Sequence, residues 1–384
     1  MKPKKEEHVD NKAYRFRLYP TEEQAVLINK TFGCVRFVYN QMLAHRKAIY
    51  ERFKEDKEAM KQQKYKLPAD YKKEFEWLKE VDSLALSNAQ LNLPAAYQNF
   101  FRDTSIGYPR FKSKHHDRKS YTTNNQKGTI RLLDERTIRL PKLKDVRIKL
   151  HRTIQQPAAI KSATISQTST GAYYISIVVE SSKKEPVMTT LTYETVLGLD
   201  YSSKALYVDS ESGSAEYPRF YRKAEEKLKK AARKLSKRKK GSKNRDKQRQ
   251  KVARLHEKVA YQRKDFLHKR SRQITNAYQA VVIEDLNMRG MAQGLNLAKS
   301  TNDNGFGMFR NFLKYKLAAQ GKPLIIIDRW FPSSKLCHVC LNKNNELTLE
   351  LRTWSCRHCG SELDRDINAA INIKNEGCRI LGIA

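Results

Sequence analysis

The stretch that decides the fold of the carboxyl-terminal half is Cys337-His-Val-Cys340, followed by Cys356-Arg-His-Cys359 and then by Asp366-Ile-Asn-Ala-Ala370. Fifteen residues (341–355) separate the two cysteine pairs, a spacing typical of a zinc ribbon. Four thiolates fill the tetrahedral coordination of one Zn²⁺ and leave no open position for catalysis. We therefore predict that Cys337, Cys340, Cys356 and Cys359 bind one structural zinc ion, just ahead of a helix that opens with a carboxylate.

Two alternatives stay open for these cysteines. His338 and His358 lie inside the pairs and could replace a thiolate, and two such pairs can also arise by chance or serve redox chemistry. The matched spacing of the pairs favours the all-cysteine zinc site. The remaining thiols, Cys34 and Cys378, are too few for a disulfide scaffold, which indicates a reducing compartment.

The charge of the chain indicates its class of partner. Its 384 residues include 76 Lys and Arg against 41 Asp and Glu, for a formal net charge of +35. The excess is spread along the whole sequence, so we expect a polyanion, nucleic acid above all, to bind over a large surface in a salt-dependent way. Residues 1–10 lack an apolar signal core, and no apolar run approaches the length of a membrane span. We expect a cytoplasmic protein without a membrane partner.

The amino-terminal half predicts a small barrel interrupted by helices. Residues 13–19 alternate between apolar and basic side chains, as a strand does, and Thr21 with Gln24 forms a capping box that starts a helix. Helical patterns continue through residue 40 and again over 83–101. Further short alternating strands are predicted at 129–132, 137–140, 146–150 and 173–179. We expect the first strand to join these strands, so that the helices are an insertion into the barrel.

The carboxyl-terminal half predicts a different architecture. Apolar strands at 196–200, 205–209, 281–284 and 324–328 alternate with helices, which indicates an α/β sheet covered on both faces. Two long helices, at about 221–240 and 245–278, are expected to turn at Gly241-Ser242.

The segment from Arg222 to Lys251 carries sixteen basic and three acidic residues. Such a charge run is usually a solvated helix face, and Leu228, Ala232 and Leu235 are expected to form the stripe on which the first helix packs. The excess charge favours a nucleic-acid contact. The candidate residues are Lys230, Arg233, Lys237, Arg238, Lys243 and Arg245.

Three carboxylates are candidates for catalysis. Asp200 and Glu284 each end a buried strand, and Asp366 opens the helix after the zinc motif. In an RNase H-like sheet these positions converge on one edge and could hold two Mg²⁺ ions, which prefer oxygen ligands. Each acid could instead be an exposed strand end or a helix cap, Asp364 being a better placed cap than Asp366. Asp209, Asp285 and Asp328 are rivals of the same kind.

Together these motifs resemble the TnpB family, the transposon-encoded RNA-guided nucleases related to type V CRISPR effectors. The resemblance rests on Gly198-Leu-Asp200-Tyr-Ser, Val282-Ile-Glu284-Asp-Leu-Asn, Phe331-Pro-Ser-Ser-Lys-Leu-Cys337, and Cys356 to Ala370. Residues 14–20 and 32–40 also resemble the opening of that family, so the likeness covers nearly the whole chain.

The resemblance implies an α/β fold combined with a β-barrel and a helical lobe. A wedge barrel, similar to an oligonucleotide-binding barrel, would comprise residues 11–20 and 120–185, and a helical recognition lobe residues 21–119. A RuvC-like, RNase H-type nuclease domain would comprise 194–384, with the basic hairpin at 221–278 and the zinc ribbon at 335–361. Its metal-binding catalytic triad would be Asp200, Glu284 and Asp366.

The resemblance also implies a function. A noncoding guide RNA from the transposon end would pair with one strand of a double-stranded DNA target beside a short flanking motif, and a single Mg²⁺-dependent site would cut both strands. Ser83, Ser87 and Gln90, spaced along one helix, are candidate readers of that motif. We expect one protein chain per RNA, in the prokaryotic cytoplasm and on the nucleoid when bound to DNA.

Two other functions compete with this one. A guided or unguided binding protein of the repressor type would bind nucleic acid without cutting, and the presence of all three acids argues against it. A transposase that joins DNA strands itself is the second alternative, although no tyrosine or serine nucleophile motif stands out. Joined rather than merely cut products would distinguish it.

Overall fold

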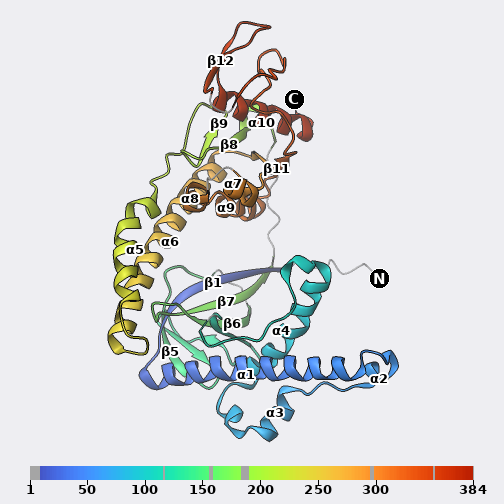
Figure 1. The fold of residues 1–384 in the computed structure, drawn as a ribbon, viewed down its shortest axis with the longest axis vertical. Helices are drawn as coiled ribbons and strands as arrows, with labels where there is room; N and C mark the ends of the chain where they lie inside the picture. Colours follow the sequence, from blue (N-terminus) through green and yellow to red (C-terminus); the bar gives the residue numbers. More distant parts are fainter. Residues whose placement is uncertain are drawn as a thin grey trace. The chain divides into compact units, whose positions relative to one another are not determined.

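The computed structural model describes residues 9–115, 117–154, 159–182, 190–294, 298–348 and 351–383. The chain divides into two compact units, Met1–Lys183 and Lys184–Ala384 (Figure 1). Among the described residues, no helix combines the length and apolar composition needed to cross a bilayer.

The first unit is built on a seven-stranded antiparallel sheet with the strand order β2-β6-β7-β1-β5-β4-β3. Strand β1 lies between β7 and β5, so the prediction that the first strand joins the later ones is confirmed. Two of the strands, β2 and β6, were not predicted. The bounds are β1 Val9–Tyr19, β2 Lys119–Asn124, β3 Arg131–Leu132, β4 Thr137–Leu140, β5 Lys144–Lys149, β6 Ala159–Gln167 and β7 Tyr173–Ser182.

Helices cover the inner face of this sheet, where the alternation of β1 buries Tyr14, Phe16 and Leu18. The predicted capping box at the start of the long helix α1 is present, because the Thr21 hydroxyl accepts from the Gln24 N–H while the Gln24 side chain accepts from the Thr21 N–H. Helix α1 packs with α4 on the apolar core of the unit (Figure 1). The helices are α1 Glu22–Phe53, α2 Lys57–Gln62, α3 Pro68–Glu74 and α4 Ser83–Arg102.

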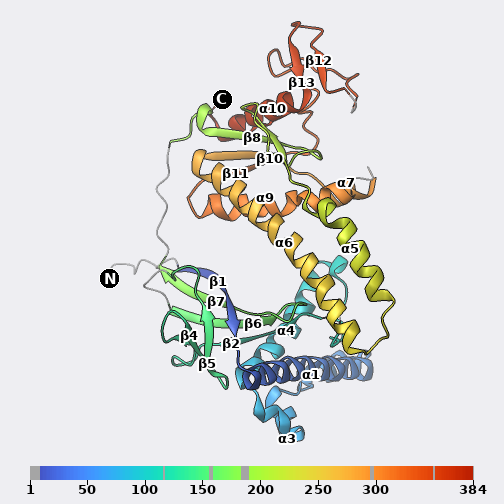
Figure 2. The same ribbon diagram turned by 90° about the vertical axis from the view of Figure 1, so that its left-hand side faces the viewer.

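The second unit contains a four-stranded sheet with the order β11-β10-β8-β9, in which β8, β10 and β11 are parallel and β9 is antiparallel. Helix α10 packs on one face, and α6 and α9 cover the other (Figure 2). The prediction of an α/β sheet covered on both faces is confirmed. The bounds are β8 Val196–Tyr201, β9 Tyr207–Asp209, β10 Ala280–Glu284, β11 Leu324–Ile327, α6 Lys243–Ala277, α9 Phe306–Ala318 and α10 Arg365–Leu381.

Helix α10 approaches the sheet unusually closely because two glycines lie at the contact. A Cβ atom on Gly198 of β8 would lie 2.3 Å from the Ala370 carbonyl oxygen and 2.7 Å from the Lys374 nitrogen. A Cβ atom on Gly377 of α10 would lie 2.2 Å from the side chain of Val282. Backbone therefore packs against backbone at Gly198, which fixes the height of α10 above the sheet.

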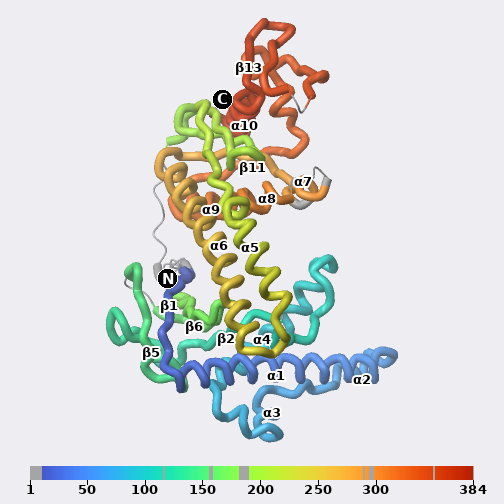
Figure 3. Tube along the Cα trace, turned by 60° about the vertical axis from the view of Figure 1, so that its left-hand side comes forward, coloured from blue at the N-terminus to red at the C-terminus, as the bar shows by residue number. Residues whose placement is uncertain are grey.

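A helical hairpin follows β9 in sequence. Helix α5 (Phe220–Ser236) runs beside α6, and the chain turns at Gly241, whose φ of 83° suits glycine (Figure 3). The prediction of the turn is confirmed. The predicted stripe was wrong at one position, since Ala231 is buried with Leu228 while Ala232 is exposed. The buried side chains are three residues apart on the helix, which brings them to the same face.

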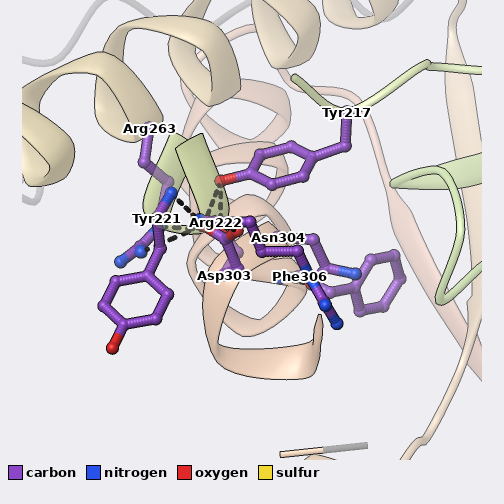
Figure 4. A network of polar contacts seen from close by, with 7 residues as sticks. All are labelled: Tyr217, Tyr221, Arg222, Arg263, Asp303, Asn304 and Phe306. Carbon is purple, nitrogen blue, oxygen red and sulfur yellow. Dashed lines mark hydrogen bonds and ion pairs between the residues drawn. The ribbon is translucent and has the colours of Figure 1, made fainter. Parts of the chain in front are cut away.

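The base of the hairpin is held by one buried carboxylate. Asp303, at the end of α8 (Ala298–Asn304), is only 2% exposed and accepts hydrogen bonds from the Tyr217 hydroxyl and the backbone N–H groups of Tyr221 and Arg222 (Figure 4). The Arg263 guanidinium lies 3.5 Å away and also donates to the Asp303 carbonyl. Asp303 of α8 therefore caps the N-terminus of α5 and also pairs with Arg263 of α6. The neighbouring short helix α7 is Met288–Gly294.

We predict that Gly198→Ala lowers the free energy of unfolding by about 3 kcal/mol, because the new methyl group meets backbone that cannot move independently. Chemical denaturation would measure this. Gly307 is the matched control, since it is helical and has open space around its Cβ position, so Gly307→Ala should leave stability unchanged or raise it slightly. Equal effects of the two substitutions would contradict the close packing of α10.

Candidate active site and zinc centre

The structure brings the three predicted carboxylates together. Strands β8 and β10 are parallel neighbours with Ile283 paired to Leu199, so the next residues, Glu284 and Asp200, lie at the same edge of the sheet. Asp366 reaches this edge from the first turn of α10, because the helix packs directly on Gly198. Residues separated by more than eighty positions in sequence thus form one acidic cluster.

The cluster is electrostatically strained. Burial of its carboxyl group raises the pKa of Asp200 well above the usual range, and the negative charges of Glu284 and Asp366 raise it further, while the positive charge of Arg365 opposes them. Burial also raises the pKa of Glu284, and a hydrogen bond from the Ser333 hydroxyl opposes that effect. Ionising these groups together is unfavourable unless a cation shares the site.

Asp366 is free of helix capping, as predicted. Asp364 is the N-cap of α10 and accepts hydrogen bonds from the backbone N–H groups of Asp366 and Ile367, each at 2.9 Å. The Asp366 carboxylate instead faces Arg352, whose guanidinium nitrogen lies 3.1 Å from both carboxylate oxygens. The Asp366 oxygens are therefore directed away from the backbone of the helix and toward the Arg352 guanidinium.

The three rival acids are engaged elsewhere. Asp209 accepts from the N–H groups of Glu211 and Gly213 within its own turn. Asp285 pairs with Arg310 and Arg329, and the Arg329 hydrogen bond is the main cause of its lowered pKa. Asp328 accepts from the Trp330 N–H. Asp200, Glu284 and Asp366 could together hold a cation, because burial and then the charges of Glu284 and Asp366 make the ionised form of Asp200 unfavourable without one.

The four predicted cysteines form one cluster in which all ligand atoms lie within 4.8 Å of one another. The Sγ atoms of Cys337 and Cys359 are 3.7 Å apart, and those of Cys340 and Cys356 are 3.6 Å apart. Zn–S bonds of about 2.3 Å in a tetrahedron place sulfurs about 3.8 Å apart, so the site fits zinc. His338 is not part of the cluster; its ring nitrogen contacts the Asn368 side chain instead.

Comparison with known proteins finds relatives along nearly the whole chain. A protein of Streptomyces pristinaespiralis is 36% identical over 375 residues, which cover 95% of this chain and 89% of that protein. The protein InsQ of Escherichia coli K12 is 30% identical over 388 residues, covering 96% and 93%. Both are named as RNA-guided DNA endonucleases.

Family models match three parts of the chain. Residues 176–294 match OrfB_IS605, described as "Probable transposase", and residues 306–373 match the "Cas12f1-like, TNB domain". Residues 11–55 match a model described as a helix-turn-helix domain. With the relatives above, these matches decide the family.

The chain belongs to the TnpB family.

The fold of this TnpB-family chain is also found in a solved structure. The Cas12f1 protein in a complex with single guide RNA and target DNA superposes with a TM-score of 0.58 at 13% identity, over 96% of this chain and 99% of that one. The TnpB/Cas12-like fold with a cysteine cluster is therefore established. One family description does not fit: residues 11–55 contain strand β1 and the single helix α1 rather than a helix-turn-helix.

Two asparagines connect the zinc centre to the acidic cluster, and sequence reasoning missed both. Asn368 accepts from the His338 N–H and donates to the Leu336 carbonyl, while Asn372 donates to the carbonyls of Ser333 and Leu336. Both side chains are buried. Their spacing of four residues places them on one face of α10, which is the signal that could have identified them.

Most of the predicted nucleic-acid residues of the hairpin are free to bind. Lys230, Arg233, Lys237, Arg238 and Lys243 are exposed. Arg245 is half-buried, and its guanidinium donates to the carbonyls of Leu235 and Arg238 at the end of α5. Arg245 therefore holds the turn of the hairpin in this structure.

The candidate motif readers lie on α4. Ser83 and Ser87 are exposed, whereas Gln90 is half-buried. The Ser83 hydroxyl accepts from Lys72 at 2.6 Å, and the Ser87 hydroxyl donates to the Ser83 carbonyl at 3.2 Å. Their role in reading DNA stays a prediction.

The outer face of the seven-stranded sheet offers a second basic surface, which sequence reasoning did not select. Arg15 and Arg17 of β1 lie 4.1 Å and 5.0 Å from the ring centre of Tyr174 on β7. Arg147 and Tyr19 form a similar cross-strand pair. Guanidinium groups held against aromatic rings suit phosphates and unpaired bases. The alternation of basic residues in β1 was the available signal.

We predict that Asp200→Asn stabilises the protein in Mg²⁺-free buffer near neutral pH. In the wild type, the raised pKa of Asp200 means that its ionised form penalises the folded state above that pKa. The penalty disappears as the pH falls through the raised pKa toward the ordinary value, so the advantage of the variant should shrink there. Thermal unfolding at pH 5–8 would measure it.

Asp328→Asn is the control for that experiment. It removes one negative charge at the same edge of the sheet from an exposed residue outside the cluster. A gain in stability equal to that of Asp200→Asn would mean that the acidic cluster is not strained.

We predict that Cys356→Ser loses the zinc ion and loosens the ribbon, because metal binding and local folding are linked. Metal analysis should find about one zinc per chain in the wild type and in His338→Ala and His358→Ala, but little in Cys356→Ser. Limited proteolysis should cleave the variant between the cysteine pairs. Zinc retention and unchanged proteolysis in Cys356→Ser would refute the four-cysteine site.

Proposed function

We propose that this TnpB-family chain is an RNA-guided DNA endonuclease of a transposon and that Asp200, Glu284 and Asp366 are its catalytic, Mg²⁺-binding residues. The observation that carries the proposal is the convergence of the three carboxylates at one edge of the α/β sheet, where burial and then the charges of Glu284 and Asp366 raise the pKa of Asp200. The names of its relatives support the same activity. On this proposal residues 194–384 form a RuvC-like nuclease domain.

Within the site, each residue has a distinct task. Asp200 and Glu284 offer half-buried carboxylates at the ends of two strands, and Asp366 supplies a third from the helix. Two Mg²⁺ ions, when bound, would activate a water for attack on the phosphorus and neutralise the leaving 3′ oxygen. Ser333 fixes the orientation of Glu284 through its hydrogen bond. Arg352 balances the charge of Asp366 and lies where it can also meet a phosphate.

The zinc ribbon acts as a support for this site. The hydrogen bonds of Asn368 and Asn372 tie the segment from Ser333 to His338 to α10, and Asp366 lies two residues before Asn368 on the same helix. The ribbon also carries Arg352, which contacts Asp366 directly. Zinc binding would thereby help to position Asp366 and Arg352 without taking part in the chemistry.

Nucleic-acid partners follow from the charge. We assign the guide RNA to the basic surfaces, including the outer face of the seven-stranded sheet and the hairpin, and the sequence specificity to base pairing between guide and target DNA. On this assignment the first unit comprises the wedge barrel (11–20 and 120–185) and the recognition lobe (21–119), with Ser83, Ser87 and Gln90 near the flanking motif.

The test is a plasmid-depletion assay. The chain is expressed with the RNA of its own transposon end against plasmids that carry the matching target beside randomised flanks. We expect one class of flanks to be lost with the wild type and retained with Asp200→Ala, since one ligand of the Mg²⁺ site is missing. RNA that co-purifies with Asp200→Ala should stay within a few-fold of the wild type, because the basic surfaces are intact.

Each alternative result has a clear meaning. Depletion by Asp200→Ala would remove that residue from the catalytic set. No depletion by the wild type, with RNA still bound, would point to a binding protein of the repressor type. Joined DNA ends instead of linear products would point to a transposase.

A further inference from the structure

Trp330 is a large aromatic side chain that the proposed catalytic set does not use. It is 84% exposed, more than any other large apolar side chain among the described residues. Within that part of the chain, no aromatic ring and no cation is stacked on its indole. A single exposed apolar residue needs no explanation by itself, so its surroundings decide whether it has a role.

The loop that carries Trp330 is anchored at both ends to the acidic cluster. Ile327, the last residue of β11, is paired with Glu284, and its carbonyl accepts from the Asp285 N–H. Six residues later, the Ser333 hydroxyl donates to the Glu284 carboxylate. The indole therefore projects from a short loop whose two ends both contact the strand end that supplies Glu284.

The loop itself is well fixed. The backbone N–H of Trp330 donates to the Asp328 side chain at 2.7 Å, and the backbone N–H of Phe331 donates to the Asp328 carbonyl at 3.2 Å. The next side chain, Phe331, packs against the apolar core under α10. With Phe331 held inside, Trp330 is turned outward, so its exposure follows from the backbone geometry.

Two arginines meet near the start of this loop: Arg329 directly precedes Trp330, and Arg310 of α9 joins it at Asp285. Arg329 and Arg310 share the single negative charge of Asp285, at 3.3 Å for Arg310, and both guanidinium groups are partly exposed. With Asp285 and the neighbouring Asp328 the local charge is balanced, but both guanidinium groups are partly exposed and can still donate to a phosphate. An exposed ring beside exposed arginines is the combination that single-stranded nucleic-acid sites use, since rings stack on bases and cations hold phosphates.

We propose that Trp330 stacks on an unpaired base of the DNA strand held at the acidic cluster, with Arg329 and Arg310 on the adjoining phosphates. The inference rests on the proposed function for its substrate and adds the residue that positions the strand. Base stacking is tolerant of sequence, so this contact would hold any strand that base pairing has exposed to the site. The charged residues beside Trp330 in sequence make an apolar protein partner a poorer fit.

A binding experiment tests the contact without requiring cleavage. The chain contains three tryptophans, Trp77, Trp330 and Trp354, so intrinsic fluorescence is readable. Asp200→Ala protein, purified with its guide RNA, is titrated with a ten-residue single-stranded thymidine oligonucleotide. We expect the oligonucleotide to quench the tryptophan fluorescence of the Asp200→Ala protein. The quenching should be smaller when Trp330→Phe is added to Asp200→Ala, since phenylalanine keeps a ring but removes the indole that reports the contact. Equal quenching in the two proteins would overturn the proposal.

A kinetic experiment tests its consequence. Single-turnover cleavage by Trp330→Ala should be slower by about tenfold, while Trp330→Phe should recover most of the rate. The unfolding temperature of both should stay close to that of the wild type, because the Trp330 side chain is 84% exposed. Phe101→Ala, which removes a ring that is 74% exposed on α4, serves as the control for a general loss of aromatic surface.

Substrates with a single abasic site complete the design. The wild type should be slowed by an abasic site at one position near the cut, whereas Trp330→Ala should not respond to it, because the two changes remove the same contact. An equal response of both proteins at every position would refute stacking. If the wild type cuts no DNA, the proposed function fails, and fluorescence alone decides whether Trp330 contacts the strand.

Discussion

The site depends on the direct packing of α10 against the backbone of β8. A helix usually lies on a sheet across a layer of side chains, but here Gly198 removes that layer and lets the Ala370 carbonyl and the Lys374 N–H approach the strand. Gly377 allows the same approach to Val282. Asp366 is thereby lowered to the edge where Asp200 and Glu284 end. The close contacts at Ala370, four residues after Asp366, and at Gly377 therefore determine where the Asp366 carboxylate lies.

This arrangement lowers the stability of the folded protein in order to bring the carboxylates of the proposed site together. Three carboxylates placed together raise the free energy of the folded state while no cation is present, and burial adds to the cost at Asp200 and Glu284. The surrounding structure offsets it with local contacts: Ser333 donates to Glu284, and Arg352 faces Asp366. On the proposed function the two metal sites would not compete, since the soft sulfur ligands of the four-cysteine cluster suit zinc whereas hard carboxylates suit Mg²⁺.

The sequence was most informative where the pattern was local. Continuous apolar runs predicted the parallel strands around Asp200 and Glu284, and the capping box at Thr21 predicted the start of α1. Strands β2 and β6 were missed because Lys, Ser and Thr interrupt their alternation, and their pairing with each other decides their structure. The stripe of α5 was wrong at one residue because Ala231 and Ala232, three and four positions after Leu228, both fall near its face of the helix, and the sequence does not decide which of them is buried. Ser333 and Arg352 act through partners elsewhere in the fold, which no periodicity reveals. For Asn368 and Asn372 the four-residue spacing on one helix face was the one available signal.

The cysteine cluster and the three carboxylates are therefore structurally connected. Asn368 and Asn372 connect them, because each uses its side-chain amide to hold the segment that runs from Ser333 into the first cysteine pair. That segment touches Glu284 at one end and enters the zinc centre at the other. A helix whose first turn carries Asp366 thus fixes, through Asn368 and Asn372, the loop whose Ser333 orients Glu284, so the positions of two of the three carboxylates are coupled through α10.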